Sequence, residues 1–374
     1  MKRDFLKHCR RIVIKAGTSM LTGKSGRISL NRLGALGDQI QELIRRKKEV
    51  ALVSSGAIAF GMEACNMQTR PKLMAELQAC AAIGQGRMMH AYENFFSKKK
   101  RKTSQILLTR DGLEKRDRFL AARNTFEELF KMKVLPIINE NDTIATEEIA
   151  FGDNDILSVH VAHLVHAELL IILSDVNGFY LQDGTRVPEV HSEQEIDQKL
   201  VQHLKDYKKE KTVGGMRAKL EAARVAMRLG VPIAIVSGRD ENILTKMITG
   251  EDVGTVFLAD RKNKNARKNW IAYSVARKGV IVVDQGAYEA LQMKKRSLLP
   301  SGIIKIKGAF IKGQMVELEN SDGIAFGRGL VRYSSKELGV IAGKKTHEIQ
   351  SLLGYKYHDE AIHRDDLVIW NQCA

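Results

Sequence analysis

Short apolar segments alternate with longer amphipathic segments over the first 258 residues of this 374-residue chain. Apolar runs without polar alternation are typical of strands buried on both faces, and a 3.6-residue period is typical of helices that cover a sheet. Strands are expected at residues 11–15, 50–54, 105–108, 134–138, 169–174 and 233–236. Helices are expected at residues 30–47, 73–96, 117–131 and 216–229. This alternation predicts an α/β layer fold with a mainly parallel central sheet.

The pattern changes near residue 280, where glycines separate shorter strand-like runs. Such runs are expected at residues 281–283, 303–306, 315–319 and 329–333. They predict a small, compact β-barrel at residues 280–374. We therefore expect a first domain at residues 1–258 and a basic connector at residues 259–279.

The net charge of +16 is concentrated in one segment rather than spread along the chain. Residues 261–280 hold seven cations and no acid, whereas residues 281–374 have a net charge of only +2. A surface that follows a phosphate backbone should be strongly basic. The distribution of charge therefore argues against nucleic-acid binding by the C-terminal domain.

The composition excludes several other classes of protein. A hydrophobic fraction of 44% with 28% charged residues is ordinary for a globular chain. No apolar run approaches the roughly 18 to 20 residues of a membrane span, and the N-terminus has no signal-peptide core. The four cysteines have no regular spacing, so we expect neither disulfides nor a zinc site, and a cytoplasmic location.

A glycine-containing turn follows each of the first two predicted strands. In parallel sheets, ligands bind at the carboxyl ends of the strands, which is where these turns lie. The first reads Lys15-Ala16-Gly17-Thr18-Ser19, with Gly23-Lys24-Ser25 soon after. Its spacing misses the phosphate loop G-x-x-x-x-G-K-[ST] by one residue, but Gly17 can offer backbone amides to a phosphate beside the Lys15 cation. The second turn, residues 54–61, leads small residues into a helix. A plain turn after the strand would explain the first segment without a ligand, and a tight turn with an N-capping serine would explain the second.

Carboxylates and amides gather after the strand that ends at Ile138. Asn139-Glu140-Asn141-Asp142 follows it directly, and Gly152-Asp153-Asn154-Asp155 comes soon after. Polar groups this dense are costly to order unless they bind something, although two solvated turns are the alternative. A further segment begins a predicted helix and reads Gly214-Gly215-Met216-Arg217-Ala218-Lys219. Its backbone amides and its lysine suit phosphate oxygens. The alternative is a glycine turn with a surface lysine.

Three histidines at a three-residue spacing, His160, His163 and His166, suggest a metal site at first sight. A strict three-residue step drifts around a helix, and no carboxylate is spaced to complete a ligand set. We predict no metal site here, but a sheltered, hydrogen-bonded helix face.

In this order the loops resemble those of the amino acid kinase family, and the pair N-E-N-D and G-D-N-D resembles its glutamate-phosphorylating members. The resemblance covers nearly the whole chain. It also includes Ser55-Gly56-Ala57-Ile58-Ala59, Ala82-Ile83-Gly84-Gln85 and Leu108-Thr109-Arg110. The C-terminal part, with Leu298–Ile303 and His363-Arg364-Asp365-Asp366, is similar to the PUA domain, a module that binds RNA in other proteins.

The resemblance implies a three-layer sandwich and ATP-dependent phosphorylation of the γ-carboxylate of L-glutamate to L-glutamyl 5-phosphate, the first step of proline biosynthesis. It implies ATP and Mg²⁺ as cofactors, proline as a feedback inhibitor and a homo-oligomer. A γ-carboxylate with a pKa of about 4.3 is already ionised at neutral pH, so the reaction needs no general base. The loops accordingly contain no candidate catalytic histidine.

The family's residue roles carry over position by position. Lys15 and Lys219 would neutralise the transferring phosphoryl group, and Asp153 would orient both lysines. Glutamate would be held by Ser55, Asp142 and Asn154, with Asp142 facing its ammonium group. The nucleotide site would comprise Lys15, Gly17, Ser174, Asp175, Val213, Gly214, Gly215, Met216, Arg217, Ala218 and Lys219.

The last of these loops departs from the family pattern. Where members typically read G-T-G-G-M-x-T-K, residues 212–219 read T-V-G-G-M-R-A-K. The lysine is kept, but two hydroxyls and one glycine are lost, which is expected to alter the affinity for the nucleotide.

Two alternatives to glutamate phosphorylation remain. An RNA-binding or RNA-modifying protein would fit the PUA-like domain, but its net charge of +2 makes RNA binding unexpected. Another kinase of the family could use aspartate or N-acetylglutamate as the acceptor. The N-E-N-D loop and the PUA-like domain favour glutamate.

Overall fold

The computed structural model divides the chain into two compact units, Met1–Lys262 and Asn263–Ala374, which are described separately here. The described residues are 3–23, 27–109, 112–113, 116–144, 154–196, 200, 215–259, 279–294, 296–356 and 358–370. The predicted basic connector falls almost entirely outside them, so its boundaries stay predictions.

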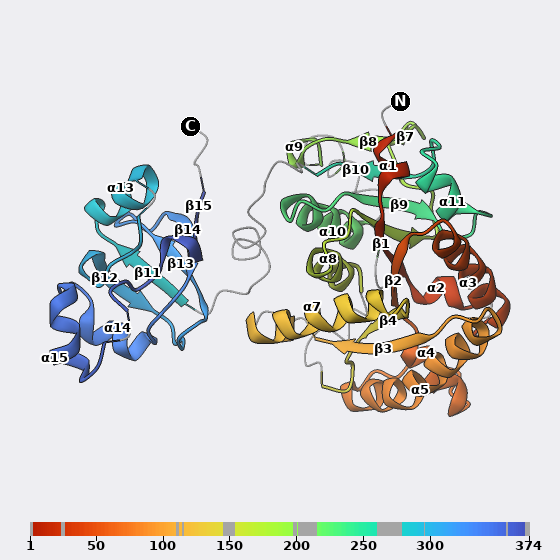
Figure 1. The fold of residues 1–374 in the computed structure, drawn as a ribbon, viewed down its shortest axis with the longest axis horizontal. Helices are drawn as coiled ribbons and strands as arrows, with labels where there is room; N and C mark the ends of the chain where they lie inside the picture. The colour runs from red at the N-terminus through yellow and green to blue at the C-terminus, as the bar shows by residue number, and fades with distance from the viewer. Residues whose placement is uncertain are drawn as a thin grey trace. The chain divides into compact units, whose positions relative to one another are not determined.

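An eight-stranded sheet organises the first unit, in the order β3-β4-β2-β1-β5-β9-β10-β8 (Figure 1). The strands are β1 Arg11–Ala16, β2 Glu49–Ser54, β3 Thr103–Leu108, β4 Leu135–Glu140, β5 Leu169–Ser174, β8 Glu189–Val190, β9 Ile233–Ser237 and β10 Thr255–Phe257. Every neighbouring pair is parallel except β9 with β10. The predicted mainly parallel sheet is confirmed. A separate hairpin pairs β6 Phe179–Tyr180 with β7 Arg186–Val187.

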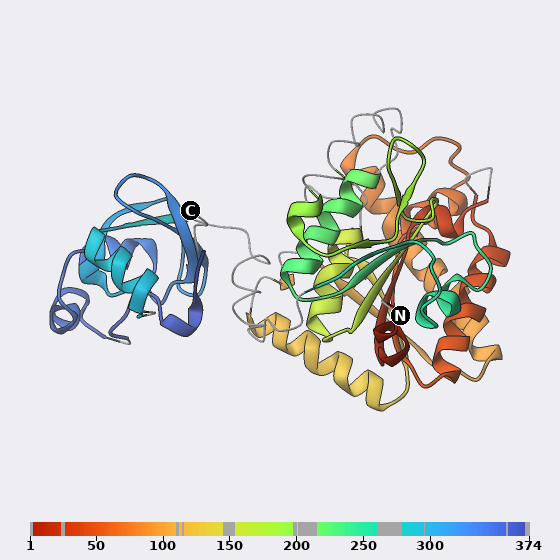
Figure 2. The ribbon, with the colours of Figure 1, turned by 90° about the horizontal axis from the view of Figure 1, so that it is seen from above.

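Helices cover both faces of this sheet, as Figure 2 shows, with yellow and green helices on one side and red and orange helices on the other. The helices are α1 Phe5–His8, α2 Thr18–Leu21, α3 Leu30–Arg45, α4 Ala57–Ala64, α5 Met74–Lys98, α7 Arg116–Lys131, α8 Asn154–Leu164, α9 Glu193–Glu195, α10 Met216–Arg228 and α11 Ile243–Ile248. The three-layer sandwich is confirmed.

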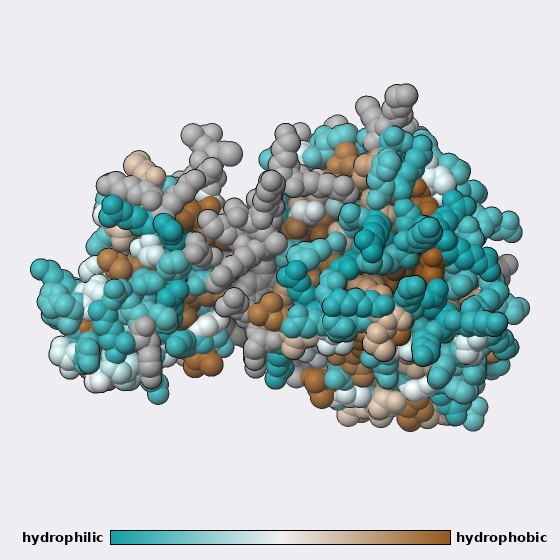
Figure 3. Space-filling view, in the orientation of Figure 1, coloured by the Kyte–Doolittle hydropathy of each residue, from teal (hydrophilic) through white to brown (hydrophobic). Residues whose placement is uncertain are grey.

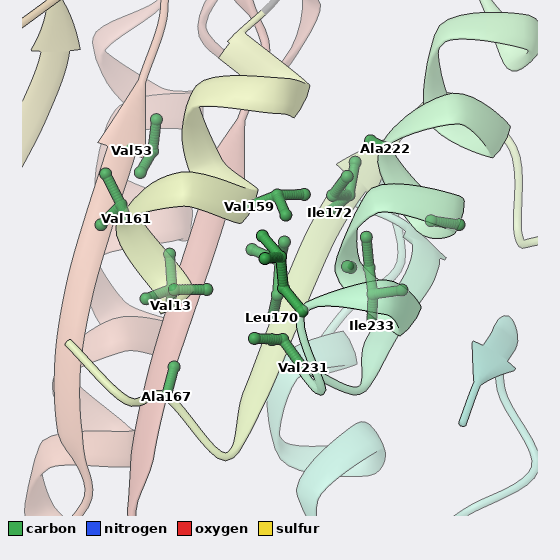
Figure 4. Packing of buried hydrophobic residues seen from close by; sticks show 14 of the residues in the cluster. Val13, Val53, Val159, Val161, Ala167, Leu170, Ile172, Ala222, Val231 and Ile233 are labelled. Atoms are coloured by element: carbon green, nitrogen blue, oxygen red, sulfur yellow. The ribbon is translucent and has the colours of Figure 1, made fainter. Parts of the chain in front are cut away.

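Two hydrophobic cores fill the space between the sheet and its helices. Alternate residues of β1 point to opposite faces, so Val13 packs with α7, α8 and α10, whereas Ile12 and Ile14 pack with α3 and α5. Figure 4 shows the first core, in which Val13, Val53 and Leu170 from the sheet meet side chains of α8 and α10. Burial on both faces explains why the strands have no polar alternation.

The second unit contains a five-stranded sheet in the order β12-β11-β13-β14-β15. Its elements are β11 Gly279–Val283, α13 Gln285–Lys294, β12 Ile303–Lys307, β13 Met315–Glu319, β14 Ala325–Leu330, α14 Ser335–Ile341, α15 Ile349–Leu353 and β15 Leu367–Ile369. Only β11 and β13 pair in parallel; the other neighbours are antiparallel. The predicted small β-rich domain is confirmed, although no pairing in the described part closes β12 onto β15 as a full barrel would.

The surface of the molecule is mainly hydrophilic on the face seen in Figure 3, with apolar side chains scattered among the charged ones. No helix in the described part of the chain is long and apolar enough to cross a membrane.

Candidate active site

The polar loops singled out from the sequence converge at one edge of the central sheet. Strands β4, β2, β1 and β5 are neighbours and run in parallel, so their carboxyl ends lie side by side. The register pairs Ala16 at the end of β1 with Ser54 at the end of β2 and with Leu173 on β5. This is the edge where ligands bind in parallel α/β sheets.

A buried carboxylate joins two lysines at this edge. Lys15 lies near the end of β1, and its Nζ is 2.6 Å from Oδ1 of Asp155. Lys219 lies in the first turns of α10, and its Nζ is 3.2 Å from Oδ2 of the same carboxylate. Asp155 is fully buried, and the two lysines are only 4% and 8% exposed. Because charges this deeply buried need partners, Asp155 fixes where both ammonium groups stand.

The Asn154 side chain links three loops directly beside this ion-pair network. Its amide nitrogen donates to the backbone carbonyl of Ser54 at 3.0 Å, to Oγ of Ser55 at 3.0 Å and to Oδ1 of Asn139 at 2.8 Å. The Asn139 amide in turn donates to Oε1 of Gln85 at 2.9 Å. Since Asn154, Asn139 and Ser55 are buried, these bonds hold the ends of β2 and β4 against α8.

Close packing of α4 on α5 brings Gln85 within hydrogen-bonding distance of Asn139. A Cβ on Gly84 would stand 1.8 Å from the backbone carbonyl oxygen of Ala57, and one on Gly61 would stand 1.9 Å from that of Cys80. No side chain fits at either position, so only glycine allows the two helices to approach this closely. Gly56, which begins the turn into α4, has a φ of 115° that also favours glycine.

Two helix N-termini face the same edge. Asn154 is the first residue of α8, and Gly215 is the N-cap of α10, one turn before Lys219. The unpaired backbone amides at a helix N-terminus attract anions. Together with two fixed ammonium groups, they make this edge suited to phosphate oxygens.

Asp142 follows β4 and has an unusual pKa. Burial raises the pKa of its carboxyl group to about 6, although the nearby Arg70 acts in the opposite direction. A partly desolvated carboxylate gains most from a bound cation, such as the ammonium group of an amino acid.

The residues predicted to touch a nucleotide are only partly gathered. Ser174 ends β5 and is buried, whereas Asp175 is about half exposed and pairs with Arg239, whose Nη2 is 2.7 Å from Oδ1 of Asp175. On α10, Met216 is buried and Arg217 is exposed, with Ala218 between these extremes. Gly17 lies beside Lys15, since a Cβ there would be 3.5 Å from the lysine Nζ.

Three predicted residues, Asp153, Val213 and Gly214, lie outside the described residues, so their roles stay predictions. Sequence reasoning gave Asp153 the orienting role and missed Asp155, the carboxylate that contacts both lysines. The signal for Asp155 was its place at the start of a helix with few charged residues, where a buried charge needs a partner. Asn139 and Gln85 were also missed, although both belong to segments that carry the family resemblance.

The histidine series on α8 behaves as a structural feature. His160 and His163 are buried, and burial lowers the pKa of His163 to about 4, which keeps it neutral. His166 lies beyond the helix with a φ of 51° and is exposed, so the predicted sheltered face holds only for the first two. Within the described residues, no group of three or more His, Cys, Asp or Glu side chains is arranged to hold a metal ion.

Known proteins are similar to this chain over nearly its whole length. The model of the amino acid kinase family matches residues 10–237, and that of the PUA domain matches residues 279–353. The chain is 42% identical to a glutamate 5-kinase of Geobacter sp. (strain M21) and 44% identical to one of Syntrophotalea carbinolica, in each case over 99% of this chain and 100% of the relative. A solved UMP kinase from Bacillus anthracis is 16% identical over 67% of this chain and 97% of its own, with a TM-score of 0.46.

The chain therefore belongs to the amino acid kinase family. Within that family its full-length relatives are glutamate 5-kinases, and like them it extends over both domains.

Proposed function

We propose that this protein transfers the γ-phosphoryl group of ATP to the γ-carboxylate of L-glutamate, the first step of proline biosynthesis. The observation that carries the proposal is the buried carboxylate of Asp155 holding Lys15 and Lys219 at the carboxyl edge of the sheet. The full-length similarity to glutamate 5-kinases supports the choice of acceptor.

In this reaction a γ-carboxylate oxygen of glutamate attacks the γ-phosphorus of ATP, and the bond to the β–γ bridging oxygen breaks as ADP leaves. The nucleophile is already an anion at neutral pH, so no side chain has to remove a proton. The protein's task is to align the two anionic substrates and to stabilise charge on the phosphoryl oxygens. Lys15 and Lys219 supply that charge from two different elements, in positions fixed by Asp155.

Glutamate would lie beside the Asn154 network. Ser55 offers its hydroxyl, Asn154 organises the loop ends, and Asp142 offers a carboxylate to the ammonium group of the substrate. The nucleotide would lie over Gly17 and the start of α10, with Ser174 and Asp175 at its border.

Mg²⁺ would come with the nucleotide rather than from a protein cage. The central carboxylate is held by two ammonium groups and is a poor metal ligand in that state. Mg²⁺ usually keeps several waters and binds through substrate phosphates, whose charge it shields. The remaining proposals are a homo-oligomer, feedback inhibition by proline, and a cytoplasmic location, the last consistent with three free cysteines among the described residues.

An ATP-dependent hydroxamate assay on the full chain tests the acceptor. It compares glutamate, aspartate and N-acetylglutamate, and we expect product with glutamate alone. Product with another acceptor and none with glutamate would refute the proposal.

The same assay on variants tests the two lysines. Lys15→Ala and Lys219→Ala should each lower kcat by at least about 100-fold, whereas the exposed Lys7→Ala control should match the unmodified protein. Unchanged turnover in either active-site variant would remove that lysine from the mechanism.

A further inference from the structure

A second cation-rich region lies at the opposite edge of the same sheet. There, a cavity of about 660 Å³ opens where β1, β2 and β4 begin and where α3 and α7 end. Seven lysine and arginine side chains line it, against two carboxylates, Glu49 and Glu127. All of them belong to the described part of the first unit. We call this cavity the basic cavity.

Both carboxylates of the basic cavity are already engaged. Glu49 pairs with Arg10 at 2.7 Å and with Arg11 at 2.8 Å. Glu127 pairs with Arg11 at 2.6 Å, and the hydrogen bonds from that guanidinium hold the pKa of Glu127 below its usual range. The acids therefore neutralise the arginines beside them. Of the five other cations, Lys131 pairs with Glu128 at 2.6 Å, which leaves four uncompensated.

Four of those cations have no carboxylate within ion-pair distance among the described residues: Lys47, Lys48, Arg101 and Lys133. Arg101 donates through Nη1 to the backbone carbonyl of Lys133 at 2.7 Å, but its Nε is buried without a hydrogen-bond partner in the described structure. A buried donor without a partner is costly, and it is satisfied when an acceptor enters.

Two of the lysines also occupy strained backbone positions. Lys47 and Lys133 follow α3 and α7 with φ values of 63° and 58°, where glycine is the usual residue. Attraction to the carbonyl end of a helix explains one cation per helix terminus. It does not explain four uncompensated cations around a single cavity.

The floor of the basic cavity is apolar. Phe130, Val134 and Leu135 are each at most 9% exposed, and the Arg11 guanidinium carbon lies 4.5 Å from the centre of the Phe130 ring. A cationic rim over an apolar floor is a binding site for a small, highly charged anion, with room for an attached ring.

We infer that the basic cavity binds a small molecule with two or more phosphate groups. Four uncompensated cations match the charge of such a ligand, which is either an inorganic polyphosphate or a nucleoside polyphosphate whose base would rest on the floor. The site is distinct from the active site, because the five steps from the first to the last residue of β1, at about 3.3 Å each, separate the two edges by roughly 17 Å.

Titration calorimetry of the full chain tests this site, with inorganic tripolyphosphate as one probe and Mg²⁺-free ATP as the other, at constant ionic strength. We expect two sites per chain for tripolyphosphate, one at Lys15 and Lys219 and one in the basic cavity. In the Lys47→Gly/Lys133→Gly variant the second site should weaken at least tenfold. If the double variant also loses binding of ATP in the basic cavity, the ligand of the cavity is a nucleoside polyphosphate. If it loses binding of tripolyphosphate alone, the ligand is an inorganic polyphosphate.

The matched control is Lys100→Gly. Lys100 also follows a helix with a positive φ, 57°, and is exposed, but it does not line the basic cavity. This control removes one lysine at one such position, where the double variant removes two, and because Lys100 lies outside the basic cavity it should keep both sites. One site in the unmodified protein, two undiminished sites in the double variant, or an equal loss in Lys100→Gly would overturn the inference. Thermal denaturation checks that every variant is folded.

Discussion

The two edges of the central sheet both collect cations, but they hold them in opposite ways. At the carboxyl edge, Lys15 and Lys219 are buried and share the carboxylate of Asp155. At the amino edge, Lys47 and Lys133 are exposed and have no carboxylate partner among the described residues.

The difference follows from the cost of burying charge. A buried ammonium group is stable only with a partner, and the partner then fixes its position. An exposed lysine remains hydrated and mobile, so it can adapt to a ligand but cannot hold a reacting atom in place. Fixed cations therefore suit transfer chemistry, and mobile cations suit recognition.

The largest expected effect comes from removing the shared carboxylate. Asp155→Asn leaves two buried ammonium groups without their common partner, so kcat should fall by at least about 100-fold. Glu49→Gln is the matched control, because it removes a carboxylate from the arginines of the amino edge and should change kcat less than twofold. Turnover close to that of the unmodified protein in Asp155→Asn would break the contrast between the edges.

The sequence predicted the sheet well because burial on both faces leaves a clear pattern. β1, β2 and β5 each contain an uninterrupted apolar run, and the helices between them have regular periods. The short strands β8 and β10 were missed, since two or three residues carry no periodicity. The predicted loops also met at one edge, as the topology of a parallel sheet requires.

The sequence did not predict which side chains of the site form ion pairs and hydrogen bonds with one another. Asp153, Asn154 and Asp155 are three polar residues in succession, and nothing in their order says which of them contacts the lysines; the contacts of Asp155 come from the structure. The contact of Asn139 with Gln85 depends on how closely α4 packs on α5, and this distance leaves no periodic signal.

The second prediction concerns the amide that joins the loops at the carboxyl edge. Asn154→Asp keeps the shape of the side chain but places a carboxylate oxygen where Asn154 donates to three acceptors. Loss of these buried bonds should lower the free energy of unfolding by about 2 kcal/mol. Urea denaturation measures this. The exposed Asn94→Asp on α5 serves as the control and should change stability by less than about 0.5 kcal/mol. Equal stabilities of the two variants would show that the buried hydrogen bonds of Asn154 contribute no more to stability than the exposed bond of Asn94.

The third prediction uses the raised pKa of Asp142. With a pKa of about 6 in the free protein, its carboxylate is mostly ionised at pH 7 and mostly protonated at pH 5. Since only the ionised form attracts an ammonium group, KM for glutamate should rise about tenfold between pH 7 and pH 5. Asp142→Asn should have a high KM at both pH values. A pH-independent KM in the unmodified protein would contradict the role of Asp142.

The smallest expected effect is a change in the free energy of unfolding on substitution at either end of β2. Gly56 follows this strand with a φ of 115°, whereas Lys47 precedes it with a φ of 63°. A non-glycine residue in this region costs roughly 1 kcal/mol, so Lys47→Gly should raise the free energy of unfolding by up to about 1 kcal/mol, while Gly56→Ala should lower it. Urea denaturation would reveal both signs. A destabilised Lys47→Gly would mean that the lysine makes contacts that stabilise the fold, and the amino edge would then resemble the carboxyl edge in fixing the positions of its cations.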